Sequence, residues 1–500
     1  MENAIVNLSA RQLRMMIGRK AISPVEVVNA YIEQIENFNA GINAICATDF
    51  ERALNAAKVA EQAVMNSESL GRLHGLPLGV KDLTETAGLL TTFGNIDKRA
   101  HVPDRDNSMV ARLRQAGAIV LAKTNTPDMG AGANTRNAVW GATGNPFNPK
   151  LNAGGSSGGS AAALATNMVP LATGTDVGGS LRIPAALCGI VGMRPSPGMI
   201  GQDSRKLGWH VLNIIGPMAR NVEDLALLFA SSMGEDRLDP LAYPANPQVV
   251  WPIKDIDLAT LRVGYTEDFG CCSVDPMIRR AFRLRIQAIS RHVSICEPIE
   301  LNLGNVHRAF DVLRAEGFLA QMGQSYEKDP DSLSSNVRAN MEIARQLTLS
   351  DRAWAHLEQT SIMQSFARKL RDYDVILSPT TPVSPFPWEK LYADEIDGQK
   401  MDNYYQWLAL TYVVTLSTHP ALSLPMGLDE CQMPFGIQMI GPLHQDGRLI
   451  AIAKAFESAF EDDLILKRPI PDTSKLRKDT AGLRTIVTHP PIFPEGAATA

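Results

Sequence analysis

Two glycine-rich segments joined by a short alanine run constrain this 500-residue chain more than any other feature. The first covers residues 154–160 (GGSSGGS) and the second covers residues 174–180 (GTDVGGS). Residues 161–165 (AAALA) between them predict a tightly packed helix, because alanine is the best helix former. Glycine weakens regular elements and is most useful where the backbone turns sharply or approaches a ligand closely. A helix followed by a returning strand would bring serines of both segments together, which indicates a nucleophile and its support.

The composition excludes several classes of protein. Hydrophobic residues make up 45% of the chain and charged residues 20%, as in an ordinary globular protein. The net charge of −5 gives no basic excess, so we expect no nucleic-acid partner. No apolar stretch reaches the roughly 18 residues of a spanning helix, so we expect no membrane partner. The start of the chain lacks a secretory signal pattern, and we expect a cytoplasmic protein.

The six cysteines are scattered, with no CxxC pair and no ligand spacing for zinc. We therefore expect reduced thiols and no metal site. Residues 108–122 combine a helix-like pattern with a strand-like run, an alternation typical of α/β proteins. Further strands are predicted at 261–265, 374–379, 421–425 and 435–440, and helices at 50–65, 222–233, 277–292, 306–322 and 449–460.

Lys81 directly follows the strand-like residues 74–80 (HGLPLGV). A lysine at the end of a central strand would be buried, and burial can lower a lysine pKa by up to about 3–5 units. Such an uncharged lysine could act as a base. The alternative is a surface lysine paired with Asp82 or Asp104, which is the commoner environment for lysine.

A nucleophile elbow of the G-x-S-x-G type is the obvious rival interpretation of residues 154–158. That elbow must follow a buried strand, but residues 145–150 (NPFNPK) contain two prolines, which cannot join a central ladder. His419 and Asp446 are available as partners, yet nothing in their setting requires that role. A P-loop is excluded because no G-K-[ST] sequence occurs here.

Residues 154–160, together with 174–182 (GTDVGGSLR), resemble the amidase signature family of Ser-Ser-Lys hydrolases. The likeness extends over about residues 8–465. It includes the segments 75–82, 123–125, 145–146, 378–380 and 434–442. The spacings also agree with the family, because Lys81 and Ser156 are 156 − 81 = 75 residues apart, and Ser156 and Ser180 are 180 − 156 = 24 apart.

The resemblance implies a Ser-cisSer-Lys triad in which Ser180 is the nucleophile, Ser156 the bridging serine after a cis peptide bond, and Lys81 the base. Two further sets follow from it: the oxyanion hole formed by backbone N–H groups of Val177, Gly178, Gly179 and Ser180, and the acyl pocket lined by Met129, Gly130 and Ala131. The two small residues of that pocket suggest room for a bulky or aromatic group. No cofactor and no metal are implied.

The resemblance also implies the fold, an α/β/α sandwich with a large mixed β-sheet flanked by helices. We expect one domain over residues 1–470, with a peripheral helical region at about 200–370. The Pro-rich tail, residues 471–500, is expected to pack loosely. Asp176 and Arg182 are expected to form a buried scaffold pair. Ser157 and Ser160 are expected to be structural hydroxyls, with a contact of Ser157 to the lysine as an alternative.

Two functions remain open. The first is a free-standing amidase acting on a small, apolar or aryl carboxamide as its small-molecule substrate, with ester or carbamate (urethane) cleavage as a variant and a homodimer as a compatible assembly. The second is the A subunit of a glutamyl-tRNA amidotransferase, which works in a complex. Relatives of the second kind usually carry glutamine after the arginine of the second motif, and Ile183 at that position favours the free-standing enzyme. A member that only binds is disfavoured, because all three triad residues are present.

Overall fold

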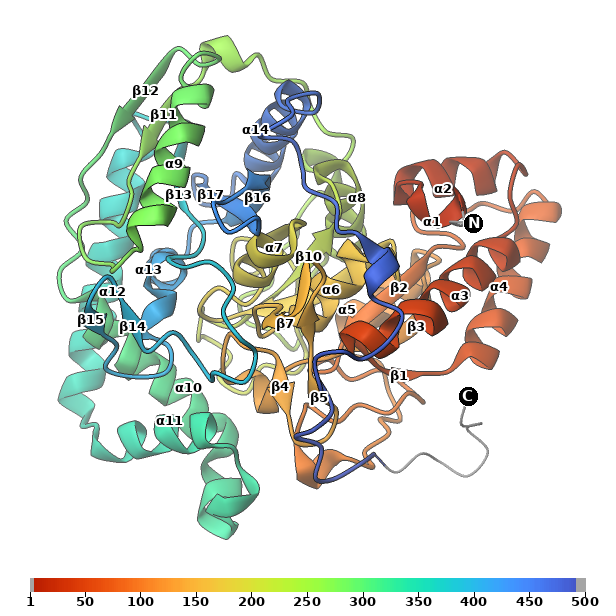
Figure 1. The fold of residues 1–500 in the computed structure, drawn as a ribbon, viewed down its shortest axis with the longest axis horizontal. Helices are drawn as coiled ribbons and strands as arrows, with labels where there is room; N and C mark the ends of the chain where they lie inside the picture. The colour runs from red at the N-terminus through yellow and green to blue at the C-terminus, as the bar shows by residue number, and fades with distance from the viewer. Residues whose placement is uncertain (1–3, 492–500) are drawn as a thin grey trace.

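The computed structural model describes residues 4–491, and an eleven-stranded mixed sheet forms the centre of the fold (Figure 1). In spatial order the strands are β1 (Ile45–Thr48), β3 (Ile119–Thr124), β2 (Pro77–Lys81), β8 (Leu171–Asp176), β10 (Ile214–Ala219), β9 (Val191–Arg194), β16 (Ala421–Leu428), β17 (Pro434–Ile440), β13 (Val375–Pro379), β11 (Arg262–Tyr265) and β12 (Ile295–Pro298). β2 pairs in parallel with β3 and β8, whereas β8 pairs with β10 antiparallel. The α/β class with a large mixed sheet flanked by helices is confirmed.

The α-helices of the described residues are α1 (Ala4–Asn7), α2 (Ala10–Gly18), α3 (Pro24–Ile42), α4 (Phe50–Met65), α5 (Ser108–Gln115), α6 (Gly158–Ala165), α7 (Arg182–Cys188), α8 (Val222–Ser232), α9 (Pro276–Ile289), α10 (Val306–Lys328), α11 (Ser335–Gln346), α12 (Leu349–Lys369), α13 (Ala409–Ser417) and α14 (Asp446–Ala459). Figure 1 shows α1–α4 on one side of the molecule, α10–α12 on the other, and α6 and α7 between them. The two glycine-rich segments therefore lie at the centre of the fold.

Short strand pairs occupy the loop between β3 and α6. They are β4 (Arg136–Asn137) with β5 (Gly141–Ala142), and β6 (Gly144–Asn145) with β7 (Asn148–Asn152). A third small pair, β14 (Glu395–Ile396) with β15 (Gln399–Lys400), lies between β13 and α13. These three short pairs are separate from the central sheet.

Helices α10–α12 account for much of the predicted helical region at 200–370, but that region is not helical throughout. Strands β10, β11 and β12 also fall in it and belong to the central sheet. The chain returns to the sheet there because β11 pairs in parallel with both β12 and β13, which extends the sheet to its far edge.

The described part of the C-terminal tail is packed against the body, in contrast to the expected loose packing. The side chains of Leu476 and Leu483 are buried. The backbone N–H of Ala142 donates to the Leu483 carbonyl at 2.7 Å, and the Trp388 indole donates to the Ala481 carbonyl at 3.1 Å. Residues 492–500 lie outside the described residues.

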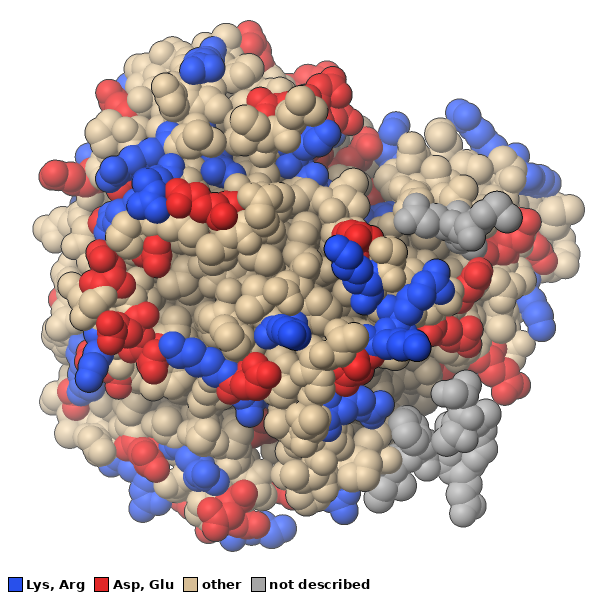
Figure 2. All heavy atoms as spheres, viewed as in Figure 1, with Lys and Arg blue, Asp and Glu red and all other residues tan. Residues whose placement is uncertain are grey.

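The surface carries both signs of charge. On the face shown in Figure 2, Lys and Arg side chains are interspersed with Asp and Glu side chains. Among the described helices, none combines the length and the apolar character that crossing a bilayer would require.

Candidate active site

Lys81, the last residue of β2, is fully buried, so the alternative prediction of a surface lysine is wrong. Its Nζ lies 2.7 Å from Ser156 Oγ, 2.8 Å from Ser157 Oγ and 2.9 Å from Thr175 Oγ1. Burial places the pKa of this amine well below its ordinary value, although the charge of Asp176 acts in the opposite direction. The structure therefore favours an uncharged amine surrounded by hydroxyl groups.

The three hydroxyl contacts of Lys81 determine how an uncharged amine can be satisfied by hydrogen bonds. An ammonium group donates three hydrogen bonds, whereas an uncharged amine donates two and accepts one at its lone pair. With three hydroxyl neighbours, an uncharged Lys81 is fully satisfied only if one hydroxyl donates to it. That hydroxyl is then in position to give up its proton to the lysine.

Ser156 lies at the start of the turn before α6, and the Gly155–Ser156 peptide bond is cis, as the resemblance implied. The residue is buried. A Cβ on Gly130 would lie only 3.5 Å from Ser156 Oγ, so the loop containing Gly130 runs directly past this hydroxyl. The same loop passes Gly155, where a Cβ would lie 2.9 Å from the Ala133 carbonyl carbon.

Ser180 lies in the turn between β8 and α7, and its side chain is half-buried. The Ser157 N–H donates to the Ser180 carbonyl at 3.3 Å, which joins the two glycine-rich segments. Within residues 4–491 the Ser180 hydroxyl makes no hydrogen bond. Ser180 is thus the most accessible of the three triad candidates, as a nucleophile must be.

Only glycine fits at position 179 of this turn. Its φ is +121°, and a Cβ there would lie 2.2 Å from Thr411 Oγ1. Thr411 in turn donates to the Gly178 carbonyl at 2.6 Å, which fixes the turn from the side of α13. The glycines of the second motif therefore serve close packing as much as open space for a ligand.

Asp176 holds the turn from beneath. Its carboxylate accepts the N–H groups of Gly179 at 3.0 Å and Leu181 at 3.1 Å. Arg182 and Arg194, both fully buried, pair with it at 2.9 and 3.2 Å. Burial alone would raise the pKa of Asp176, but the two guanidinium groups hold it well below its usual range. The expected Asp176–Arg182 pair is present, and Arg194 extends it to a buried cluster.

The hydrogen bonds accepted by Asp176 leave fewer backbone N–H groups of this turn available as oxyanion donors. The Gly179 N–H is already taken by Asp176. The N–H groups of Val177, Gly178 and Ser180 make no hydrogen bond within the part of the chain that the structure describes. These three backbone donors are free to face a substrate oxygen.

The remaining hydroxyls divide between two roles. Ser157 contacts Lys81, as one of the two interpretations proposed. Ser160 instead donates to the Thr173 carbonyl at 2.8 Å and has a structural role. The sequence motifs did not identify Thr175. Successive side chains of β8 point to opposite faces of the sheet, so Thr175 lies on the face opposite to Asp176.

Met129, Gly130 and Ala131 lie in one loop beside Ser156. Met129 and Ala131 join a small apolar cluster with the side chains of Phe318, Met322, Leu333, Val337 and Met341. Those residues come from α10, α11 and the segment between them, so this helix pair forms the wall that faces the loop of Met129 and Ala131. The sequence alone does not indicate that wall, because its residues are more than 180 positions away along the chain.

The partners proposed for the rival elbow interpretation are engaged elsewhere. His419 Nδ1 contacts the Ser417 carbonyl at 2.8 Å, and burial lowers the pKa of this imidazole to about 4. Asp446 accepts hydrogen bonds from the backbone and hydroxyl of Ser196. Neither side chain contacts Ser156, and the geometry gives no Ser-His-Asp triad here. Within residues 4–491, no cluster of three or more His, Cys, Asp and Glu side chains could hold a metal ion.

Comparison with known proteins places these features in a family. The model of the family described as Amidase matches residues 26–450. The chain is 31% identical to the A subunit of the glutamyl-tRNA(Gln) amidotransferase of Acidothermus cellulolyticus, covering 95% of this chain and 99% of that one. It is also 31% identical to an acylamidase of Rhodococcus erythropolis, covering 90% and 95%. Among solved structures, a bacterial aryl acylamidase of the amidase signature family superposes with a TM-score of 0.84 at 28% identity, covering 90% and 96%.

Proposed function

Because this chain belongs to the amidase family, we propose that it hydrolyses a small carboxamide with an apolar or aryl acyl group through an acyl-enzyme on Ser180. The observation that carries this proposal is the buried amine of Lys81, in contact with Ser156 Oγ at 2.7 Å. Serine alone is a weak nucleophile and needs an adjacent base. An uncharged lysine reaching through a second serine supplies that base.

In the first step, Ser156 Oγ gives its proton to Lys81 Nζ and takes the proton of Ser180 Oγ. The Ser180 oxygen bonds to the carbonyl carbon at the same time, and the carbonyl oxygen becomes an oxyanion. The free N–H groups of Val177, Gly178 and Ser180 are the donors that stabilise this charge. Losing one such donor typically costs about 3 kcal/mol of transition-state stabilisation.

In the second step, the proton held by Lys81 returns through Ser156 to the amide nitrogen. The C–N bond then breaks and the amine leaves. Water attacks the resulting ester, giving its proton to the same relay, and Ser180 regains a proton as the acid departs. Esters and carbamates would likewise transfer their carbonyl group to the Ser180 oxygen, and they are proposed as further substrates.

The apolar cluster of Met129 and Ala131 with α10 and α11 supports an apolar acyl group. Gly130 lets Leu83 pack beside Ser156, because a Cβ on Gly130 would lie 2.7 Å from Leu83 Cδ1. Burial of an apolar acyl group stabilises binding by about 25 cal/mol for each Å² removed from water. An aryl group has more apolar surface to bury than an acetyl group.

A panel of chromogenic anilides, esters and carbamates tests the proposal, with acetyl, butyryl and benzoyl versions of each. We expect the benzoyl anilide to have the highest kcat/KM among the anilides. Brief incubation with the benzoyl ester, followed by acid quench and peptide mass mapping, should find the acyl group on Ser180. Turnover without any acylation of Ser180 would overturn the mechanism.

A second candidate is the A subunit of a tRNA-dependent amidotransferase, which hydrolyses glutamine within a complex. Full-length identity to such subunits, 31% over 513 aligned residues, supports it. Ile183, buried beneath Gly179, replaces the glutamine usual in those subunits and argues against it. Ammonia release from glutamine by the isolated chain, compared with aryl anilide hydrolysis, separates the two candidates.

A further inference from the structure

Two adjacent cysteines lie in the turn between β11 and α9, apart from the proposed catalytic relay (Figure 1). Both are free thiols, and Cys271 Sγ lies 3.8 Å from Cys272 Sγ. Cys271 is partly exposed to solvent, whereas Cys272 is buried. Neither the triad nor the proposed acyl pocket uses these thiols.

Cys271 differs from the other cysteines of the chain in how readily it forms a thiolate. A hydrogen bond from the Cys272 thiol lowers the pKa of Cys271, although burial and the charge of Asp268 act in the opposite direction. The thiolate is the form of cysteine that reacts with oxidants. Burial raises the pKa of each of the other thiols, those of Cys46, Cys188, Cys272, Cys296 and Cys431.

These observations match what an oxidant-sensitive cysteine requires. Such a residue is accessible to solvent, has a low pKa and lies beside a second cysteine that can resolve its oxidised form. Cys271 meets the first two conditions, and Cys272 supplies the third. The turn therefore has the composition of an oxidation site.

The carbonyl of Cys271 is held by His307, in the first turn of α10. His307 Nε2 lies 3.1 Å from this carbonyl oxygen. Because a carbonyl can only accept, Nε2 carries the hydrogen of this bond. In a neutral imidazole the other nitrogen, Nδ1, then accepts a hydrogen bond from the Tyr412 hydroxyl. His307 thus connects the cysteine turn to α13.

Tyr412 belongs to the part of α13 that supports the candidate oxyanion turn. Its neighbour Thr411 donates to the Gly178 carbonyl at 2.6 Å. The Tyr412 ring stacks on the Phe310 ring, with centroids 4.2 Å apart and planes inclined by 7°. Phe310 lies against Gly178, where a Cβ would be 3.1 Å from Phe310 Cζ. The contacts of Cys271 therefore lead through His307 and Tyr412 to the backbone of Gly178.

We propose that Cys271 and Cys272 are a redox modification site, at which a hydroperoxide converts the two thiols into a disulfide and thereby lowers amidase activity. The effect on activity rests on the proposed amidase function. The formation of the disulfide does not depend on that function.

The reaction balances with hydrogen peroxide as the oxidant. The Cys271 thiolate attacks one peroxide oxygen, the O–O bond breaks, and the departing hydroxide takes up a proton to become water. Cys271 is then a sulfenic acid. The Cys272 sulfur attacks the Cys271 sulfur, the S–O bond breaks, and the second water leaves with the Cys272 proton. The two thiols have lost two electrons, and the peroxide has been reduced to two waters.

Closing this disulfide must change the backbone of the turn. The bonded sulfur atoms would be about 2.0 Å apart, so Cys271 Sγ and Cys272 Sγ must approach by about 1.8 Å. The Cys271–Cys272 peptide bond is trans, and a trans peptide holds adjacent Cα atoms about 3.8 Å apart, closer than most disulfides allow. The closed ring contains the peptide unit whose carbonyl His307 binds. We expect this carbonyl to rotate away from His307, which weakens the support that Tyr412 and Thr411 give to Gly178.

Mass mapping without reduction tests the modification itself. The tryptic peptide 263–279 contains both cysteines of the turn and no other cysteine. After treatment with hydrogen peroxide, we expect it to lose two hydrogen atoms before any other cysteine of the chain is oxidised. Dithiothreitol should restore its mass. Earlier oxidation of another cysteine, or accumulation of a sulfinic acid on Cys271 without a disulfide, would overturn the proposal.

Activity before and after oxidation tests the consequence. With an aryl anilide as the substrate, kcat of the wild type should fall at least tenfold on oxidation and recover in dithiothreitol. Cys271→Ser should keep the activity of the reduced wild type and lose this response. Cys431→Ser, at an exposed cysteine outside the turn, is the matched control and should keep the response. Disulfide formation that leaves kcat unchanged would contradict the proposed link to the oxyanion turn.

Substitution of His307 tests the route between the two sites. His307→Ala should lower kcat in the reduced state with little change in KM, and oxidation should then lower kcat less than twofold further. His307→Gln, which offers both a donor and an acceptor, should restore part of kcat. A full response to oxidation in His307→Ala would exclude His307 as the positioning residue. A wild type inactive on every anilide and ester would refute the proposed function, while the mass of peptide 263–279 would still show whether the disulfide forms.

Discussion

The amine of Lys81 occupies a site where a positive charge is unfavourable, and the hydroxyls around it are its direct hydrogen-bond partners. Asp176 is the nearby charge that favours protonation, but its carboxylate is shared between Arg182 and Arg194. A carboxylate neutralised in this way can do little to hold a proton on the lysine. Burial therefore decides the charge state of the amine, and the arginines indirectly support that result.

The depressed pKa of Lys81 predicts a pH-dependent stability. Between the folded pKa and the unfolded value of about 10.4, the unfolded chain binds a proton that the folded chain does not. The free energy of unfolding of the wild type should then rise with pH relative to Lys81→Met, by up to about 1.4 kcal/mol per pH unit. Below the folded pKa the difference becomes constant. Urea unfolding of both proteins from pH 7 to 10 measures it, and parallel curves would contradict an uncharged lysine.

Substitution of Ser180 tests its role as the nucleophile at the other end of the relay. Ser180→Ala should abolish turnover of every amide and ester in the panel, because no other hydroxyl in the turn is free to attack. The melting temperature should stay close to that of the wild type, since the Ser180 hydroxyl makes no hydrogen bond within residues 4–491. Residual turnover comparable to the wild type would contradict its role as the nucleophile.

At the scale of elements, the turn between β8 and α7 is held from two directions. Asp176 binds its N–H groups from the sheet side, and Thr411 of α13 binds the Gly178 carbonyl. α13 is more than 220 residues further along the chain than the turn, yet it leaves no room for a side chain at Gly179. The shape of the candidate oxyanion hole is therefore a property of two elements together.

Substitution of Gly179 by alanine tests this arrangement. The new Cβ would meet Thr411 Oγ1 at 2.2 Å in a backbone conformation that side chains rarely adopt, so the turn must shift. We expect kcat to fall at least a hundredfold while the protein remains folded. Gly398→Ala is the matched control, because Gly398 also has a positive φ of +75° but nothing within 4 Å of its Cβ position. Equal activity of the two variants would contradict the model of the turn.

At the scale of the whole molecule, distant segments meet around the loop that lines Ser156. The loop contacts α11 on one side, and the described tail covers the β4–β5 hairpin at its far end. Leu483 carries that last contact, packed with Ala142 and Trp388. The tail thus stabilises a loop that contributes to the candidate active site.

The tail contact predicts a measurable loss of stability. Leu483→Ala removes a fully buried side chain and should lower the free energy of unfolding by about 2–5 kcal/mol. Leu464→Ala, at a position that is 85% exposed, should change it by less than about 0.5 kcal/mol. Equal stability of the two variants would mean that the tail is not bound in solution.

Much of the fold followed from local pattern. The helix predicted at 50–65 is α4, and α3 begins with a capping box formed by Ser23 and Glu26. Such elements are predictable because caps and apolar periodicity act within a few residues. The course of the chain between 200 and 370 was not predictable in this way, since β10–β12 are defined by the strands they pair with.

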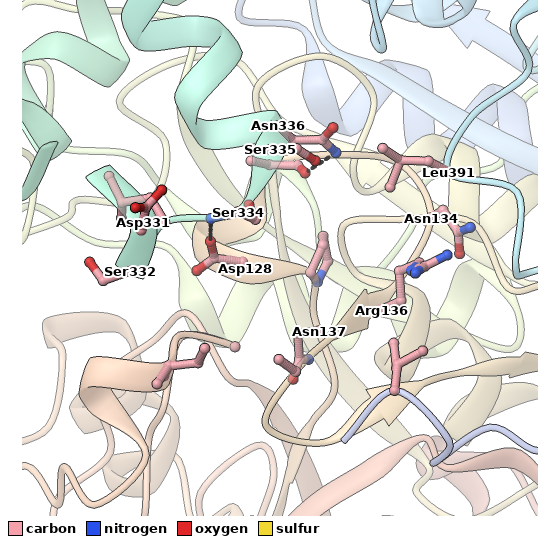
Figure 3. Close-up of a pocket in the computed structure, with 17 residues that line it drawn as sticks. Asp128, Asn134, Arg136, Asn137, Asp331, Ser332, Ser334, Ser335, Asn336 and Leu391 are labelled. Atoms are coloured by element: carbon pink, nitrogen blue, oxygen red, sulfur yellow. Dashed lines mark hydrogen bonds between the residues drawn. The ribbon is translucent and has the colours of Figure 1, made fainter. Parts of the chain in front are cut away.

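The sequence by itself determined which residues can form a Ser-Ser-Lys site, because two motifs at fixed spacing identify Lys81, Ser156 and Ser180 as candidates. Only the tertiary structure decided the state of that site. Whether Lys81 is charged depends on its burial. Which backbone N–H groups can bind a substrate oxygen depends on the hydrogen bond that the Gly179 N–H already donates to Asp176. The cavity between the loop that lines Ser156 and the start of α11 likewise exists only in the folded chain (Figure 3). The burial of a side chain, its hydrogen-bond partners and the cavities beside it depend on segments that are far apart in the chain. A local sequence pattern therefore does not predict them.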